Sequence, residues 1–309
     1  MTCYNLDSVL SNIEKKSGGI LGVSAIHLPS LERISYNSTI PFLLCSTCKI
    51  PIAVCLLKKV EENKLKLTDK VPITEFDLRV GCAMSTLNQL DYTVPVQMSI
   101  LNLLTFMLQE SCNSATDMLF KLVGGPKTVT ECMHSIGIDQ LRVDRTAFEA
   151  IGDSEGVRAD PHCTIEEYKK LASKVPPEKV RQSREQFKTD PRDKGTAEAM
   201  TDLLVKIQLR EILSEEHSSL LLKVMSHCKR GIKRIKGLLP SNINVAHKTG
   251  TAGGYTNDVG IIDLLEEQNH IAISIFLRDT GNTLTNDERI IAKVARSIYD
   301  YFKILTILK

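Results

Sequence analysis

The spacing of apolar residues predicts strands near both ends of the chain and helices between them. Residues 5–17 have the spacing of an opening helix, which Gly18 and Gly19 end. The apolar run at 20–27 follows directly and predicts a buried strand, and a second short strand is expected at 33–36. The chain therefore begins with a helix and two strands.

From 46 to about 220 the pattern is mostly helical, with breaks at Pro72, Pro95, Gly124-Gly125-Pro126 and Pro176-Pro177. Strand character returns at 244–247, 259–264 and 270–277, and a final helix is expected from about 287 to 307. Strands from both ends around a helical middle predict an α/β (α+β) fold. Its antiparallel sheet is formed by both chain ends and flanked by helices, and an all-helical lobe is inserted.

The expected domain boundaries follow from this order of elements. The sheet domain comprises residues 1–48 and 200–309, and the helical lobe comprises residues 49–199. The length of 309 residues exceeds the usual size of one domain but does not require two independent ones. Both one compact body and two interleaved lobes are compatible with it.

Composition and charge exclude several classes of protein. With 42% hydrophobic and 25% charged residues, the chain has the make-up of an ordinary globular protein. A net charge of +2 is too small to imply a polyanionic partner, and no basic run is interleaved with aromatic residues, so no nucleic acid is expected as a partner. The basic stretches Lys229-Arg230 and Lys233-Arg234 are interpreted as a solvated helix face.

The cysteines and the chain start bear on metals and localisation. The nine cysteines include one close pair, Cys45 and Cys48, but no CxxC…CxxC pattern, so neither a zinc site nor a disulfide framework is predicted, and buried free thiols are expected. The first residues carry no secretory signal, which leaves a cytoplasmic protein or the mature form of a periplasmic or secreted one. No apolar run has the length of a membrane span, and we expect a monomer.

The first motif with chemical meaning is Ser46-Thr47-Cys48-Lys49, followed by an apolar run at 50–57. A serine in the first turn of a buried helix lies where the helix dipole favours negative charge, and a lysine three residues later shares its face. That lysine is placed to remove the hydroxyl proton. The alternative is a simple N-cap serine. A second copy, Ser226-His227-Cys228-Lys229, is followed by further cations and is interpreted as a surface coincidence.

Two further motifs follow in the helical region and on a late strand. They are Ser111-Cys112-Asn113 and Lys248-Thr249-Gly250-Thr251-Ala252-Gly253. Gly250 has no side chain, which lets a substrate carboxylate or amide approach the backbone. Each motif alone is weak, and Ser35-Tyr36-Asn37 repeats the Ser-x-Asn pattern. Three in this order form the set found in class A β-lactamases and penicillin-binding proteins.

With these motifs the chain resembles the class A β-lactamases and the related penicillin-binding serine hydrolases over nearly its whole length. The resemblance extends to the stretches Gln109–Ala115, Leu122–Pro126, Ser135–Gly137, Leu238–Pro240, Val245–Gly250 and Thr256–Gly260. It implies a β-lactamase/transpeptidase-like fold and a serine hydrolase that opens a β-lactam ring through an acyl-enzyme, with no metal and no other cofactor. The partner it implies is a small-molecule β-lactam or a peptidoglycan peptide.

The resemblance implies catalytic roles for three residues of the first two motifs. Ser46 would attack the β-lactam carbonyl, Lys49 would take the proton of its hydroxyl, and Ser111 would relay a proton to the leaving nitrogen. Asn113 would hold the substrate amide.

It also implies binding roles for the third motif. Lys248 and Thr249 would bind the substrate carboxylate, with Gly250 leaving room for the substrate. The backbone N–H groups of Ser46 and Thr251 would form the oxyanion hole, aimed at the charge that develops on the carbonyl oxygen.

The chain departs from the family pattern in its second motif and beside its first. Cys112 replaces the usual aspartate, which removes a carboxylate that normally braces the lobe. Cys45 stands at a position that is often cysteine in the family, but Ala252 replaces the partner used by its disulfide-bearing members. A disulfide at Cys45 is therefore not expected.

The largest departure is an extended Ω-loop region at about 142–196. Its neck would be an ion pair between Arg145 and Asp193. The segment between them is about thirty residues longer than usual, and much of it, 165–187, has a helical pattern. It is either a surface insertion or a part of the site.

This region would contain the base for deacylation. The stretch Phe148–Asp153 resembles the family's aromatic-Glu…Asn pattern with Asp153 in place of asparagine, but it begins two residues late after Arg145. Glu149 is therefore the candidate to orient the hydrolytic water, and an exposed loop carboxylate is the alternative.

Two other kinds of protein need the same motifs. One is a D-Ala-D-Ala peptidase of the penicillin-binding type, and the other is a sensor or binding domain that β-lactams acylate with slow turnover. The rate of deacylation separates all three.

Overall fold

The computed structural model describes residues 5–81, 86–264 and 269–307. The chain forms two compact units. Unit 1 comprises residues 1–47, 138–141 and 194–309, and unit 2 comprises residues 48–137 and 142–193.

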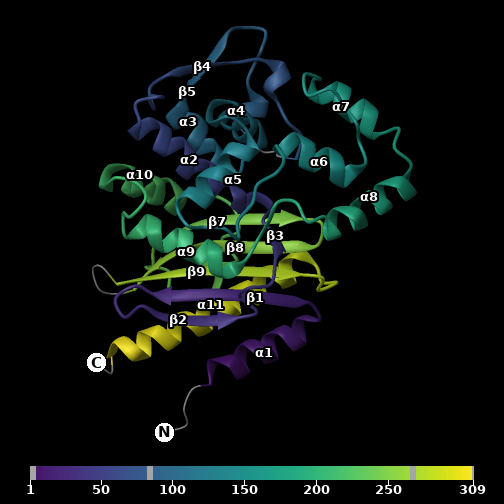
Figure 1. Ribbon diagram of the computed structural model, residues 1–309. Coiled ribbons are helices and arrows are strands. Elements are labelled where there is room, and N and C mark those ends of the chain that lie inside the picture. Colours follow the sequence, from purple (N-terminus) through teal and green to yellow (C-terminus); the bar gives the residue numbers. More distant parts are fainter. Residues whose placement is uncertain (1–4, 82–85, 265–268, 308–309) are drawn as a thin grey trace. The chain divides into compact units, whose positions relative to one another are not determined.

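Unit 1 contains a five-stranded antiparallel sheet in the order β2-β1-β9-β8-β7, with both chain ends contributing (Figure 1). Its strands are β1 (Ile20–His27), β2 (Glu32–Tyr36), β7 (Val245–Ala252), β8 (Tyr255–Asp263) and β9 (His270–Arg278). Strand β1 pairs with β9, so that Val23 lies opposite Ile275. The predicted fold class is confirmed.

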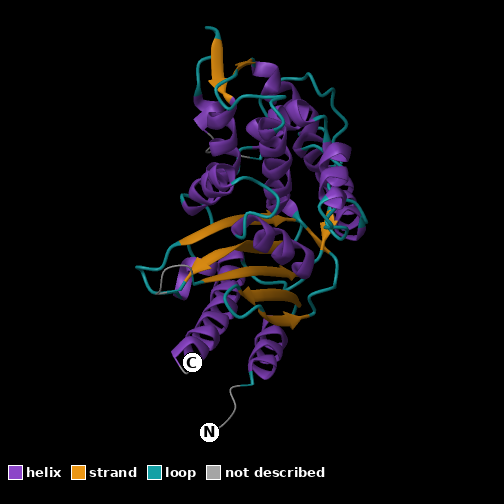
Figure 2. Cartoon of the chain, turned by 60° about the vertical axis from the view of Figure 1, so that its left-hand side comes forward, coloured by secondary structure: helices purple, strands orange, loops and turns teal. Residues whose placement is uncertain are grey.

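Helices cover both faces of this sheet because side chains of a strand alternate between its faces. Isoleucines at 271, 273 and 275 join a core with the terminal helices α1 (Leu6–Ser17) and α11 (Leu284–Ile307). Figure 2 shows these two helices on one side of the sheet. On the other face, Thr201 of α9 (Ala197–Gln208) donates to Ser274 Oγ at 2.9 Å. Helix α10 (Glu215–Ser226) packs on β7.

A short strand pair fixes the segment that leads to Ser46. Strand β3 (Phe42–Leu43) pairs with β6 (Lys194–Gly195). The Phe42 ring stacks on Phe276 at a centroid distance of 5.6 Å and fills the space beside Gly22, where a Cβ atom would lie 2.4 Å from the ring. This aromatic contact anchors the chain against the sheet shortly before Ser46.

Unit 2 is helical around α2 (Lys49–Glu61), in which residues 49–57 are all buried. A helix that is apolar on every side belongs in the centre of a unit. Helices α4 (Asn113–Val123) and α5 (Pro126–Ser135) pack against α2, and α3 (Ile100–Thr105) and α6 (Ala147–Glu155) pack against α4. The hairpin of β4 (Lys70–Ile73) and β5 (Val96–Ser99) was not predicted, because its strands are too short to show a pattern.

The insertion in the Ω region folds as two helices, α7 (Ile165–Ala172) and α8 (Pro177–Thr189), which confirms its predicted helical character. Its inner side chains are aromatic. Tyr168 meets the Phe148 ring edge to face at 5.7 Å, and the Arg145 guanidinium lies 4.7 Å from the Phe187 ring centre. The insertion thus packs against the start of α6 and the neck of the loop.

Two general expectations can be compared with the described residues. Among the residues that the structure describes, no two cysteines form a disulfide, and Cys3 and Cys82 lie outside the described residues. Among the helices that the structure describes, none combines the length and the apolar character needed to cross a membrane.

Candidate active site

Ser46 lies in a strained turn between β3 and α2. Cys45 has the left-handed φ of 50°, after which residues 45–48 form a 3-10 turn that runs into α2. The backbone N–H and the hydroxyl of Thr47 both donate to the carbonyl of Leu44, at 3.1 and 2.6 Å. The N-cap of α2 is Cys48, so Ser46 is not its N-cap serine.

Strand β7 lies directly against this turn. At Gly250, a Cβ atom would lie 2.8 Å from the Leu44 carbonyl oxygen and 3.2 Å from the backbone nitrogen of Ser46. Asn257 on β8 donates from Nδ2 to the carbonyl oxygens of Leu43 and Leu44, at 2.9 and 3.3 Å. The backbone of Ser46 is therefore held beside the third motif. Residue 250 must be glycine because a side chain at this position would displace the turn that carries Ser46.

Arg234 holds the same strand from its other side. It donates from Nη1 to the carbonyl oxygens of Gly250 and Asn257, at 3.0 and 2.8 Å, and from Nη2 to Thr251 Oγ1 at 2.7 Å. Arg234 is only 4% exposed, and residues 229–234 are not helical. The interpretation of this stretch as a solvated helix face was wrong for Arg234, because its guanidinium satisfies buried carbonyl groups.

Lys248 is completely buried, and its Nζ donates to the Thr249 carbonyl at 2.8 Å. Next to it, His247 Nδ1 lies 2.9 Å from Asp258 Oδ1, and neither side chain is exposed to solvent. Asp258 Oδ2 also accepts the Ile235 N–H at 3.1 Å. The third motif is thus part of a fully buried polar network. The sequence pattern of the motif did not predict this network.

In unit 2, the first two motifs meet at the ammonium group of Lys49. It donates to the Ser111 carbonyl at 2.7 Å, to Ser111 Oγ at 3.1 Å and to Asn113 Oδ1 at 3.0 Å. Lys49 is 2% exposed. Ser111 ends a π-helical turn at 106–110 and has the left-handed φ of 59°, which turns its side chain back to Lys49.

Cys112, which stands where the family pattern has aspartate, caps helix α4. It is buried and is the N-cap of α4, and its Sγ accepts the Ala115 N–H at 3.4 Å. A thiol caps a helix without bringing a charge into the lobe. Asn113 follows and donates from Nδ2 to the Val80 carbonyl at 3.1 Å.

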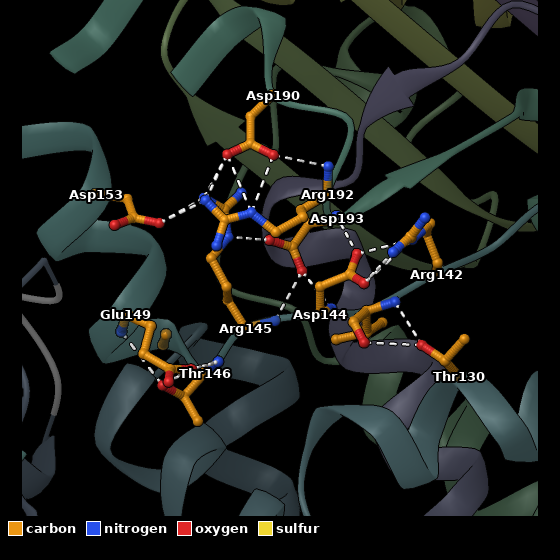
Figure 3. Close-up of polar contacts among 12 residues, drawn as sticks. Thr130, Arg142, Asp144, Arg145, Thr146, Glu149, Asp153, Asp190, Arg192 and Asp193 are labelled. Atoms are coloured by element: carbon orange, nitrogen blue, oxygen red, sulfur yellow. Dashed lines mark hydrogen bonds and ion pairs between the residues drawn. The ribbon is translucent and has the colours of Figure 1, made fainter. Parts of the chain in front are cut away.

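The predicted ion pair at the neck of the Ω region is confirmed (Figure 3). Arg145 Nε donates to Asp193 Oδ2 at 2.5 Å, and its Nη1 contacts Asp153 and Asp190 at 2.9 and 3.3 Å. Arg192 pairs with Asp153 and Asp190 as well. Its hydrogen bonds lower the pKa of Asp190 to about 2. Burial alone raises the pKa of Asp153, but hydrogen bonds from Arg145 and other cations outweigh it and lower that pKa.

Glu149 lies in the first turn of α6 with an exposed side chain. Its Oε2 accepts the N–H and the hydroxyl of Thr146, at 2.8 and 2.9 Å, and Thr146 Oγ1 accepts the Glu149 N–H at 3.2 Å (Figure 3). This reciprocal pair is a capping box.

The structure therefore groups the predicted site residues within each unit. Ser46 lies against Gly250 of strand β7, which also carries Lys248, Thr249 and Thr251. In unit 2 Lys49 joins Ser111 and Asn113. Among the described residues, no group of three or more His, Cys, Asp or Glu side chains could hold a metal ion.

Comparisons with known proteins agree with this arrangement. A family model described as the beta-lactamase enzyme family matches residues 5–302. The extended-spectrum β-lactamase PER-1 of Pseudomonas aeruginosa is 29% identical over 290 residues, which cover 91% of this chain and 82% of that protein. The β-lactamase CTX-M-97 of Escherichia coli is 30% identical over 254 residues, covering 82% of this chain and 74% of that one.

Solved structures give the same result. A crystal structure of a β-lactamase from Chitinophaga pinensis has a TM-score of 0.79 and 26% identity, and the match covers 96% of this chain and 99% of that chain. Because the family model spans nearly the whole sequence, the chain belongs to the β-lactamase enzyme family and is a serine hydrolase of the class A type.

Proposed function

We propose that the protein opens the β-lactam ring through an acyl-enzyme on Ser46. One observation carries the assignment. The backbone of Ser46 lies against Gly250 in the Lys-Thr-Gly strand, with its nitrogen 3.2 Å from where a Cβ atom of residue 250 would be. A serine whose own N–H adjoins a substrate-binding strand is suited to acyl transfer, in which charge develops on the carbonyl oxygen.

Acylation forms a bond from Ser46 Oγ to the lactam carbonyl carbon and breaks the bond from that carbon to nitrogen. Lys49 follows Ser46 by three residues and takes the hydroxyl proton. Its Nζ is 3.1 Å from Ser111 Oγ, which gives the proton a short path to Ser111 and from there to the leaving nitrogen. The contact from Lys49 to Asn113 holds the amide that would bind the substrate.

The third motif supplies binding groups. The N–H groups of Ser46 and Thr251 form the proposed oxyanion hole, and Arg234 supports it by holding the Thr251 hydroxyl and the Gly250 carbonyl. Lys248 and Thr249 bind the substrate carboxylate. A buried ammonium such as that of Lys248 attracts an anion more strongly than an exposed one, because water screens it less.

The two rival functions are not favoured. A D-Ala-D-Ala peptidase or an acylated sensor would use the same three motifs, but the relatives named above are β-lactamases. The deacylation role of Glu149 stays a prediction.

Turnover of a chromogenic cephalosporin tests the proposal. We expect hydrolysis by the wild-type protein, loss of both hydrolysis and covalent labelling by a penicillin in Ser46→Ala, and full activity in Ser226→Ala. The control is matched because Ser226 also precedes a lysine by three residues, but it ends helix α10. Labelling that persists in Ser46→Ala would reject the nucleophile.

A further inference from the structure

Two thiols from neighbouring helices of unit 2 lie in contact. Helix α5 packs against α2, and the side chains of Cys55 on α2 and Cys132 on α5 form a hydrogen bond with each other. Cys132 lies three positions after Val129 and one before Met133, which are both buried, so it lies at the inner face of α5. Neither cysteine belongs to the three motifs of the proposed site.

The two thiols differ in their access to solvent. Cys55 lies within the buried run of α2 and is only 3% exposed, whereas Cys132 is partly exposed. Cys132 is therefore the thiol that a small solute reaches first. Cys55 is the partner that already touches it, as the second cysteine of a redox pair does.

Hydrogen bonding and charge also favour reaction at Cys132. Its hydrogen bond with Cys55 lowers the pKa of the Cys132 thiol. Nearby Lys58 and Lys59 lower this pKa further, whereas burial and the Glu62 carboxylate raise it, and the lowering effects prevail. The two lysines follow Cys55 by three and four positions and so share its face of α2. The same hydrogen bond and burial raise the pKa of the Cys55 thiol. Because the thiolate is the nucleophilic form of cysteine, reaction is favoured at Cys132.

We propose that Cys132 and Cys55 form a redox site that reacts with a hydroperoxide and closes to a disulfide between α5 and α2. In the first step the Cys132 sulfur bonds to one oxygen of hydrogen peroxide and the O–O bond breaks. The other oxygen leaves as water with the proton of the Cys132 thiol, and a sulfenic acid remains.

In the second step the Cys55 sulfur bonds to the Cys132 sulfur and the S–O bond of the sulfenic acid breaks. Its oxygen leaves with the Cys55 proton as a second water. The two thiols thereby give up two electrons, which the peroxide takes. The new bond ties α2 to α5 and closes the chain from 55 to 132 into a loop, which stabilises the fold because it restricts the unfolded chain.

Peptide mapping tests the pair directly. The full-length protein is treated with hydrogen peroxide, remaining thiols are blocked with N-ethylmaleimide, and a tryptic digest is analysed by mass spectrometry without reduction. Trypsin releases Cys55 in peptide 50–58 and Cys132 in peptide 128–142, each with a single cysteine. We expect the two peptides to be linked, at a mass two hydrogen atoms below their sum, and to separate when dithiothreitol is added.

Variants assign the roles of the two sulfurs. In Cys55→Ala the sulfenic acid at Cys132 loses its partner thiol, so dimedone should trap about tenfold more of it than in wild type. In Cys132→Ser the linked peptides should be lost, and Cys55 should stay unlabelled because it is buried. Cys163→Ser is the matched control. Cys163 is also partly exposed, but burial raises the pKa of its thiol, and its removal should leave the linked peptides unchanged.

Thermal melting gives a second readout. Oxidised wild type should melt about 5 °C higher than the reduced protein, and Cys132→Ser should show no such difference. Peptides that stay separate in oxidised wild type would overturn the proposal, as would stronger dimedone labelling at Cys163 than at Cys132 in Cys55→Ala. An unchanged melting temperature in protein with linked peptides would reject the stabilising effect. Should Cys55→Ala fail to fold, the wild type and Cys132→Ser still decide whether the pair forms.

Discussion

The guanidinium of Arg145 and the carboxylate of Asp193 form the neck of the Ω region, with 2.5 Å between Nε and Oδ2. The same carboxylate accepts the backbone N–H groups of Asp144 and Arg145, and Asp144 Oδ2 accepts the Asp193 N–H at 2.7 Å. Side chains and backbone are thus held together at the two ends of the segment from Asp144 to Asp193. Closing a long segment costs conformational entropy. Fixing its two ends therefore favours the folding of α6, α7 and α8 between them.

Arg145→Ala should destabilise the protein by about 3 kcal/mol, because it leaves the carboxylates of Asp153, Asp190 and Asp193 together without their central cation. Urea unfolding followed by circular dichroism measures the loss. Arg181→Ala is the control, since Arg181 pairs with Glu178 on an exposed helix face, where ion pairs contribute little. A loss of equal size in both variants would contradict the role given to Arg145.

The loss of stability at acid pH should depend on Asp190. Its pKa in the folded protein is about 2, below the ordinary value of 3.8, chiefly because Arg192 donates to it. The stabilising contribution is therefore complete above about pH 4 and is lost as the pH falls from about 4 to about 2. We expect Asp190→Asn to lower the melting temperature at pH 7, and the difference from wild type to shrink below pH 4. A constant difference down to pH 3 would contradict this.

Gly250→Ala should abolish or strongly slow acylation while the protein stays folded. The added Cβ would lie 2.8 Å from the Leu44 carbonyl and 2.9 Å from the Cys45 Cβ, so the turn that carries Ser46 must shift. A misplacement of about 1 Å can slow a reaction by about 100-fold. The acylation rate with a fluorescent penicillin measures the effect. An unchanged acylation rate in folded Gly250→Ala would contradict this prediction.

Asp117→Ala should destabilise the protein by about 3–5 kcal/mol, because it leaves the guanidinium of Arg79 buried without its carboxylate and the start of α6 without two acceptors. Glu131→Ala is the control, as its pair with Lys127 is exposed and should give no measurable change. Denaturant titration of both variants gives the comparison. Losses of similar size would contradict it.

The sequence predicted the elements whose signals are local. The apolar run at 20–27 and the terminal helix are found almost where they were expected, as β1 and α11. The strand expected at 244–247 continues to Ala252, since Thr249 and Gly250 pair with β8 despite their weak strand pattern. Tertiary pairing overrides local preference there.

Contacts between distant residues had no local signal. Arg234 is one of several cations in its stretch, and only the fold shows that it holds the Gly250 carbonyl. The left-handed φ of Ser111 follows from the π-helical turn before it, which no residue pattern announced. The resemblance to the family paired Arg145 with Asp193 correctly, but it gave no sign of Asp190 or of the role of Asp153, because both act through the folded insertion.

The contact between Ser46 and Gly250 has a consequence for biosynthesis. Gly250 is translated about 200 residues after Ser46, the proposed nucleophile, which at 5–20 residues per second is roughly 10–40 s. Until β7 has left the ribosome and joined the sheet, Ser46 has no partner strand to bring a substrate to it. A nascent chain, or one truncated so that it lacks β7, should therefore not be labelled covalently by penicillin. Covalent labelling would therefore report when folding is complete, because it depends on the late strands of the sheet and not on Ser46 alone.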